Sequence, residues 1–400
     1  PLLRLYGRGR VVLRRIRHLL TTTMEISLLA FALAFALAFA NGANDVSKAI
    51  ATLVGSGVTD YRSAIAWGTV WTVVGAALAA FVASAMIKTF GHGLVQTGTI
   101  IEPAVTLAVL TGAIAWVLFA SRMGLPVSTT HALTGAIVGT GFVAFAGEGL
   151  IWSAIGRKIA LPLLLSPFLA FALSLLIHPA VRALARKWEG ACLCVMPASR
   201  ALVAIDAHGD TRTLFQTTSF SPPIMAVPSQ CDRAGLQGLV VGLDTIHWLS
   251  SGLASFARGT NDAPKIVAIL LLGSATAAWP SVSSQLAALG GIAIAMGLGS
   301  YFGGLRVTEV LAEKVTKMNH AEGLSANLTT LSLVLVSGSL GLPVSTTHVS
   351  SSAIIGIGLL KGRNSVRWTT VRDMVLAWIV TLPASALLAC IAYLILIRFL

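Results

Sequence analysis

Long apolar stretches separated by short polar segments dominate this 400-residue chain. Ten of them approach the roughly 20 residues that a helix needs to cross the hydrocarbon core of a membrane. They cover 25–43, 64–87, 103–120, 130–147, 152–181, 236–256, 283–304, 322–340, 347–360 and 371–397. The pattern predicts an all-α, polytopic helical membrane protein.

Two polar motifs occur twice, each inside apolar sequence. The first, Asn-Asp-x-x-Lys, begins at Asn44 and again at Asn261, and the second, Leu-Pro-Val-Ser-Thr-Thr-His, occupies 125–131 and 342–348. The offset between copies is 262 − 45 = 217 residues for the first motif and 343 − 126 = 217 for the second. This agreement indicates an internal duplication, and the repeated polar residues mark the expected functional centre.

Five apolar stretches precede a mixed polar segment and five follow it. An odd number of spans in each copy would orient the copies oppositely, as in the inverted repeats of secondary transporters, with broken or re-entrant helices at the midplane. We predict a first repeat over 24–187, a cytoplasmic linker over 188–235 and a second repeat over 236–400. The linker looks loosely structured. Its basic residues are expected on the cytoplasmic side, which places both termini outside.

The first 23 residues do not fit this topology, because they contain six arginines between Arg4 and Arg17. Such a density normally stays in the cytoplasm. We interpret 1–23 as an Arg-rich extension upstream of a natural start at Met24, where the apolar sequence begins. A targeting extension is the alternative interpretation.

Composition narrows the class of protein further. Charged residues make up 11% of the chain and hydrophobic residues 56%, whereas about 25% of a soluble domain is charged. This composition predicts a lipid bilayer as the surroundings. Most of the basic residues behind the net charge of +13 lie in predicted loops between the spans, so we expect no nucleic-acid partner. The four cysteines form no zinc or redox pattern, and no cofactor is predicted.

The Asn-Asp motifs interrupt apolar sequence, and a carboxylate such as Asp45 or Asp262 inside a membrane is costly unless it is paired or faces a polar cavity. Lys48 and Lys265 follow three residues later, so a helix would bring each lysine to the face of its aspartate and allow an ion pair. The residues at 41–44 favour a local helix break that frees backbone carbonyls for a cation. A buried clamp that only stabilises the fold is the alternative for a single copy.

The heptapeptide has the form of a helix start. Gly124 and Pro126 interrupt the chain, and Ser128 is a natural N-cap. Free backbone N–H groups and the positive end of the helix dipole would then face an anion, together with the hydroxyls that follow. The second copy would approach from the opposite side, so the two helix starts could surround a tetrahedral oxyanion.

Several histidines inside the predicted spans admit two interpretations. His131 and His348 could shuttle protons or act as neutral structural groups. Asp244 and His247 lie in the sixth span, where they could form a proton relay or simply bond each other within one helix turn.

These motifs resemble the inorganic phosphate transporter family, whose members include sodium- and proton-coupled phosphate symporters and some sulfate permeases. The resemblance rests on Asn-Gly-Ala-Asn-Asp-Val at 41–46, Gly-Thr-Asn-Asp at 259–262 and both heptapeptides, and it extends over 24–400. It implies a helical transport core with a scaffold, usually a homodimer, in a plasma membrane such as the bacterial inner membrane.

The resemblance also implies roles for individual residues. Phosphate would bind between the two helix starts, with contacts from Ser128, Thr129, Thr130, Ser345, Thr346, Thr347, Asn44 and Asn261. Cations would bind near the Asn-Asp motifs, with sodium as a candidate at Asp45 and Asp262. The chemistry of the side chains adds Lys48, Lys265, His131 and His348 to the candidate cation-coupling groups.

The chain departs from the family pattern at Lys48 and Lys265, where the motif commonly ends in Asn, and at Pro264. A lysine ammonium lies about where a ligand of a sodium site would be. It could neutralise the aspartate or contact the anion directly. We therefore expect proton rather than sodium coupling.

The leading hypothesis is a secondary active transporter that imports inorganic phosphate as a cation symporter. The alternatives are a sulfate or other oxyanion permease with the same fold, and an anion channel with the two lysines lining its pore. An intramembrane hydrolase would need one asymmetric site, yet the polar groups occur as two equal copies. No enzymatic activity is predicted.

Overall fold

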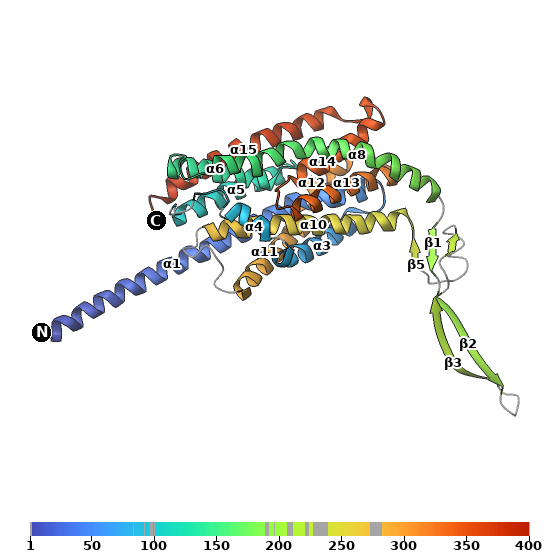
Figure 1. Ribbon diagram of the computed structural model, residues 1–400, viewed down its shortest axis with the longest axis horizontal. Coiled ribbons are helices and arrows are strands. Elements are labelled where there is room, and N and C mark those ends of the chain that lie inside the picture. The colour runs from blue at the N-terminus through green and yellow to red at the C-terminus, as the bar shows by residue number, and fades with distance from the viewer. Residues whose placement is uncertain are drawn as a thin grey trace.

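A helix occupies most of each predicted span in the computed structural model of the protein, shown in Figure 1. The structure describes residues 2–82, 84–91, 93–96, 99, 101–188, 192–195, 197–205, 211–220, 224–226, 239–272 and 282–399. Five helical segments in these ranges are long and apolar enough to cross a membrane: Met24–Gly55, Pro103–Arg122, Trp152–Arg186, Ser283–Gly303 and Trp368–Leu396. The prediction of a polytopic helical membrane protein is confirmed.

The helices form two series on either side of the linker. The first contains α1 (Leu2–Asp45), α2 (Ser47–Gly55), α3 (Tyr61–Val82), α4 (Ser84–Gly91), α5 (Pro103–Arg122), α6 (Thr129–Phe145), α7 (Trp152–Ala154), a π-helix (Ile155–Ala160) and α8 (Leu161–Trp188). The second contains α10 (Leu243–Leu272), α11 (Val282–Gly303), α12 (Leu305–Glu313), α13 (His320–Ser339), α14 (Thr346–Leu360), a 3-10 turn (Arg363–Ser365) and α15 (Trp368–Leu396).

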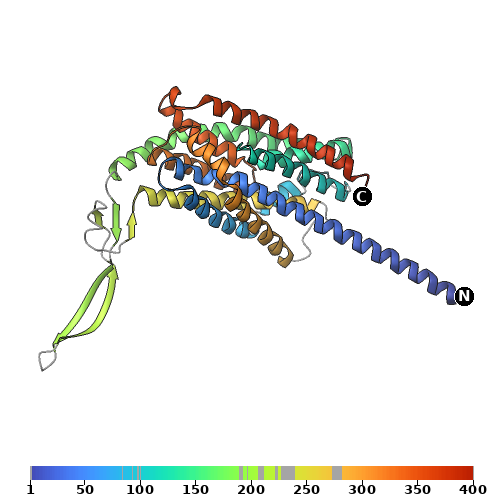
Figure 2. The ribbon, with the colours of Figure 1, turned by 180° about the vertical axis from the view of Figure 1, so that it is seen from behind.

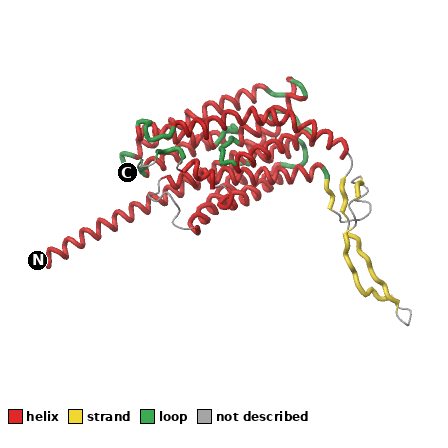
Figure 3. The backbone as a smooth tube through the Cα atoms, in the orientation of Figure 1, coloured by secondary structure: helices red, strands yellow, loops and turns green. Residues whose placement is uncertain are grey.

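The linker contains strands where loose structure was expected. They are β1 (Cys192–Val195), β2 (Pro197–Ile205), β3 (Thr211–Phe220), β4 (Ile224–Ala226) and β5 (Leu239–Val241). Strands β4, β1 and β5 form one antiparallel sheet, and β2 pairs with β3 in a separate ribbon. Strand β3 is rich in threonine and phenylalanine, and β2 contains valine and isoleucine, all of which favour strands. Figure 3 shows the strands at one end of the helices.

Two helical hairpins have matching dimensions. Helices α5 and α13 begin at 103 and 320 and end at 122 and 339, an offset of 217 residues at both ends. The turns that follow contain Gly124 at φ 72° and Gly341 at φ 65°, a left-handed conformation that glycine adopts readily. Helices α6 and α14 then begin, and they are too short to qualify as spans.

The hairpins approach each other from opposite ends of the bundle. In Figure 1, α5 and α6 lie toward the chain termini, whereas α13 and α14 lie toward the strands, and Figure 2 shows the same arrangement from behind. The hydroxyl of Thr347 at the start of α14 donates to the Val127 carbonyl, just before α6, at 2.7 Å. Helices α1 and α10 run in opposite directions.

The helix break expected at 41–44 is wrong, because α1 continues through these residues. Only Val46 separates α1 from α2, and its backbone remains helical at φ −56° and ψ −35°. Helix α10 continues through Asp262 and Pro264 without interruption. The clear breaks are the two hairpin turns, where a proline and a positive-φ glycine occur together. Asn and Gly in the first motif are tolerated in a helix because its neighbours pack closely around them.

Candidate functional site

The two Asp–Lys pairs form as the spacing predicts. The Lys48 ammonium lies 2.6 Å from a carboxylate oxygen of Asp45, and the Lys265 ammonium lies 3.0 Å from one of Asp262. All four side chains are buried. Each pair spans one helix turn, so α1–α2 and α10 each bring a neutralised carboxylate into the centre of the bundle.

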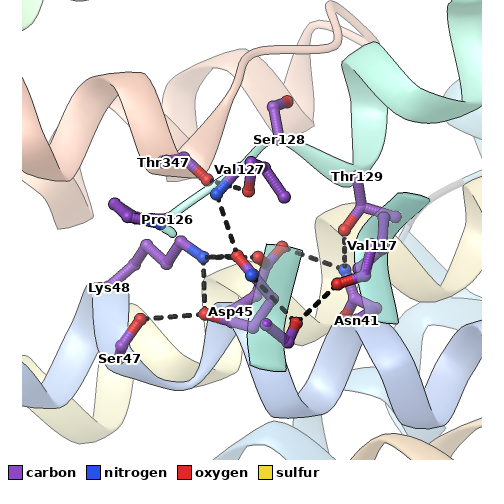
Figure 4. A network of polar contacts seen from close by, with 12 residues as sticks. Asn41, Asp45, Ser47, Lys48, Val117, Pro126, Val127, Ser128, Thr129 and Thr347 are labelled. Atoms are coloured by element: carbon purple, nitrogen blue, oxygen red, sulfur yellow. Dashed lines mark hydrogen bonds and ion pairs between the residues drawn. The ribbon is translucent and has the colours of Figure 1, made fainter. Parts of the chain in front are cut away.

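Asn41 connects the two motifs (Figure 4). Its amide nitrogen lies 2.9 Å from Asp45 Oδ2 and 3.2 Å from Asp262 Oδ2, and it also donates to the Thr129 hydroxyl at 3.1 Å. One buried side chain therefore links α1, α10 and the start of α6. Asn41 belongs to a motif recognised in the sequence, but it was not among the predicted site residues.

Arg258 is a second residue that sequence reasoning missed. Its side chain is only 1% exposed, and it donates to Asn41 Oδ1 at 3.4 Å and to the Thr72 hydroxyl. Arg258 follows Asn41 by 217 residues, so the repeat offset was the signal that could have located it. With Arg258, the described centre contains three cationic side chains and two carboxylates, a formal excess of one positive charge.

The amides predicted to bind the substrate contact protein groups in this structure. The Asn44 nitrogen donates to the Ser121 hydroxyl and to the Leu125 carbonyl, both at 3.0 Å. Its oxygen accepts from Lys48 at 2.6 Å and from the Val127 N–H at 3.2 Å. Asn44 thus fixes the turn between α5 and α6.

Asn261 has fewer contacts. Its nitrogen donates to Asp262 at 3.1 Å, and its oxygen has no protein partner among the described residues. Contact of Asn44 and Asn261 with an anion stays a prediction.

The predicted helix starts are present in both copies. The Ser128 hydroxyl accepts from the His131 N–H at 3.2 Å, and the Ser345 hydroxyl accepts from the His348 N–H at 3.1 Å. Both serines have extended backbones and both are buried. The remaining first-turn N–H groups of α6 and α14 lack intrahelical acceptors, as at any helix start. Two positive helix ends therefore lie beside the ion pairs.

A contact between the two copies joins one helix start to the opposite motif. The Lys265 ammonium donates to the Thr130 hydroxyl at 2.8 Å, in addition to its bond with Asp262. An ammonium has three N–H donors, and the described residues give Lys265 two acceptors. Its third donor is available for a further acceptor at the start of α6.

The rings of the two motif histidines pack against each other, tilted by 43°, where the helix starts meet. Their ring centroids are 4.6 Å apart, and the His348 ring also packs against Trp378 at 4.2 Å. The Trp378 indole donates to the Pro126 carbonyl at 3.1 Å, which anchors these rings to the turn before α6. The geometry brings both predicted histidines to the site and is compatible with either of their proposed roles.

Comparison with known proteins agrees with this arrangement. The family model described as "Phosphate transporter family" matches residues 41–389, which include both copies of both motifs. A protein of Rhizobium meliloti with the name "Probable low-affinity inorganic phosphate transporter" is 29% identical, over 92% of this chain and 95% of its own. A Mycobacterium tuberculosis protein with the same name is 28% identical, over 88% of this chain and 73% of its own.

A solved structure named "The sodium-dependent phosphate transporter" shares the fold. It superposes with a TM-score of 0.71 at 23% identity, over 94% of this chain and 100% of that one. The family match covers most of the chain, and the multi-pass helical fold agrees with it. The chain therefore belongs to the phosphate transporter family and is a membrane permease rather than an enzyme.

Proposed function

We propose that the protein is a secondary active transporter that imports inorganic phosphate across the plasma membrane by alternating access of two inverted repeats. The opposite directions of α1 and α10 support the inversion, as do the matching bounds of α5 and α13. In this architecture the substrate binds near the midplane, where discontinuous helices point their N-termini at an anion.

The excess positive charge at the buried centre is the observation that carries the proposal. Among the described residues there, Lys48, Lys265 and Arg258 are balanced only by the carboxylates of Asp45 and Asp262. An uncompensated charge away from water is costly, and an anion between the two helix starts would offset it. First-turn N–H groups of α6 and α14 and the third N–H of Lys265 would bind its oxygens.

We infer that a proton rather than sodium is the coupling ion. Each carboxylate oxygen of Asp45 and Asp262 already accepts a hydrogen bond, from Lys48, Lys265 or Asn41. A sodium ion beside an ammonium about 4 Å away would meet a repulsion of about 4 kcal/mol at an effective dielectric of about 20. The name of the structural neighbour includes sodium dependence, and we attribute a different coupling ion in this chain to Lys48 and Lys265. His131 and His348 are candidate proton carriers.

Transport by purified protein in liposomes tests the substrate and the coupling ion separately. Labelled phosphate and labelled sulfate are offered under an imposed pH gradient, under a sodium gradient and under neither. We expect phosphate to accumulate when the outside is more acidic and to respond little to sodium. Faster uptake of sulfate would identify a sulfate permease. Flux that never exceeds equilibrium under any gradient would identify a channel.

A further inference from the structure

A row of polar residues follows one face of α10 from the site to the end of the helix. It consists of Asp262, Arg258, Ser255, Ser251, His247 and Asp244. Successive members are three or four residues apart, which keeps them on one side of a helix. We call these residues the α10 stripe. The stripe extends over about 27 Å of helix, most of a membrane's hydrocarbon thickness.

The stripe is buried except at the end that carries Asp244, next to the strands. Ser255, Ser251 and His247 are fully buried, whereas the Asp244 side chain is 51% exposed. His247 Nε2 lies 3.0 Å from the Thr52 hydroxyl, and the Ser251 hydroxyl donates to the Ala49 carbonyl at 2.8 Å. His247 and Ser251 therefore face α2 in the interior of the bundle rather than lipid.

Three members of the stripe retain buried polar atoms without a protein partner among the described residues. These atoms are Arg258 Nε, Ser255 Oγ and His247 Nδ1. Asn327 Oδ1 on α13 and Ser351 Oγ on α14 are also buried without a hydrogen-bond partner among the described residues. Polar groups inside a membrane protein need partners, and where protein supplies none they face water or a transported species.

Ionisable groups cluster at the outer end of the stripe. Asp244 does not bond His247, as one interpretation of the sequence had it, but lies 2.5 Å from His320 Nδ1 at the start of α13. Two other titratable groups described there already have partners. Glu322 pairs with Lys361 at 2.9 Å, and His178 contacts the Ser325 hydroxyl at 3.1 Å. The Asp244–His320 pair is half exposed and can exchange protons with solvent.

The equivalent positions of the first repeat form no comparable row. Subtracting 217 from the stripe positions gives Asp45 and Asn41 at the site, and then Ala38, Ala34, Ala30 and Ser27. Ala38 and Ala34 are fully buried and belong to the largest apolar cluster. Because both helices cross the bundle, packing alone does not explain why only α10 has polar side chains at these positions.

Close packing limits what can move along the stripe. A Cβ added at Gly323 would lie 2.8 Å from His247 Cε1 and 2.9 Å from the Ser56 side chain. One added at Gly68 would lie 2.6 Å from Ile50 and 3.4 Å from Ser255 Oγ. The packing beside His247 is therefore too close for a side chain at Gly323, whereas a proton needs only groups that can hydrogen bond.

We propose that the α10 stripe is the proton pathway between the transport site and the strand end of the protein. The proton moves between the Asp244–His320 pair and His247, and then through the hydroxyls of Ser251 and Ser255 and bridging water toward Asp262. This inference rests on proton coupling in the proposed function.

Arg258 would link the proton to the anion. The Arg258 guanidinium stays protonated, so its positive charge opposes the passage of a proton along the stripe to Asp262. An anion bound beside it offsets this charge and lowers the barrier. Proton transfer along the stripe then depends on an occupied phosphate site, as a symporter requires.

The double variant Ser251→Ala with Ser255→Ala tests the pathway, because alanine is what α1 has at both equivalent positions. Two assays in liposomes are compared: accumulation of labelled phosphate driven by a pH gradient, and exchange of labelled for unlabelled phosphate at equal pH. Exchange requires no net proton movement. We expect the variant to lose accumulation by on the order of tenfold and to retain exchange. Ser250→Ala, a neighbouring buried hydroxyl outside the stripe, is the matched control.

The remaining outcomes distinguish failure of the proton pathway from failure of proton coupling itself. A variant that accumulates phosphate like the unmodified protein overturns the pathway. Equal losses of accumulation and exchange also overturn it, because the stripe would then serve the anion or the fold. If the unmodified protein exchanges phosphate but ignores the pH gradient, the proposed proton coupling fails whatever the variant does.

Discussion

The two copies of the Asn-Asp motif have the same residues but different surroundings. The Lys48 ammonium lies 2.5–2.6 Å from three oxygens, all of them on Asn44 or Asp45 in its own motif. Lys265 bonds its own Asp262 but reaches the Thr130 hydroxyl on α6 with a second donor. From this comparison we propose a division of roles, in which Lys48 stabilises the centre and Lys265 would contact the transported anion.

Replacing Lys48 should have the largest effect on stability. In Lys48→Met the buried Asp45 carboxylate loses its counter-charge, which costs about 3–5 kcal/mol for a buried pair. We expect a lower thermal midpoint in detergent and less folded protein in the membrane. Asp45→Asn combined with Lys48→Met removes the unpaired charge and should recover part of the loss. A Lys48→Met protein as stable as the original would assign Lys48 a role other than this clamp.

Replacing Lys265 should affect the substrate more than the fold. A hydrogen bond to a charged partner contributes about 1.5–3 kcal/mol, so Lys265→Gln should raise the phosphate concentration for half-maximal uptake by roughly 10- to 100-fold. Because Asp262 would be left unpaired, the same measurement is made on Lys265→Gln with Asp262→Asn. The division of roles is wrong if Lys265 variants lose stability like Lys48→Met while the surviving protein retains normal phosphate affinity.

The two serine caps should behave alike, in contrast to the lysines. Ser128 and Ser345 have nearly the same backbone conformation and each accepts one N–H bond from a histidine three residues later. Loss of an N-cap costs about 1 kcal/mol and lets the first turn of the helix loosen, so each alanine variant should weaken uptake without preventing membrane insertion. Unchanged uptake kinetics in both variants would show that the anion binds elsewhere in the protein. A large effect in only one would extend the asymmetry of the lysines to the helix starts.

The sequence could predict the elements that repeat and the contacts within one motif. Spacing alone was enough for the Asp45–Lys48 pair and the caps at Ser128 and Ser345, because these depend on one helix turn. Contacts between distant segments could not be predicted in this way. The bonds of Asn41 to Asp262, and of Lys265 to Thr130, depend on how α1, α6 and α10 pack together.

Arg258 could have been located from the repeat offset, since it is the equivalent of Asn41. Its burial was not predictable, because Arg258 lies just beyond the predicted span 236–256, where a long arginine side chain is normally expected to reach the membrane surface. The strands of the linker were missed for a different reason. Their residues favour strands but form no long alternating pattern of apolar and polar positions.

The smallest predicted effect is a change in the response to sodium. Lys48→Asn with Lys265→Asn restores the commoner family motif and leaves the Asp45 and Asp262 carboxylates without their ammonium partners. A cation could then approach these carboxylates without the repulsion that the lysines cause. We expect the double variant to gain sodium stimulation of phosphate uptake by a few-fold, with reduced stability that sodium partly restores. Binding to the folded state alone stabilises a protein by mass action, so a thermal midpoint that rises with sodium, and not with equal potassium, would report the new site even if transport is weak.

Strong sodium stimulation of the unmodified protein would show instead that the lysines do not exclude sodium. Proton coupling would then lose its main support in this structure.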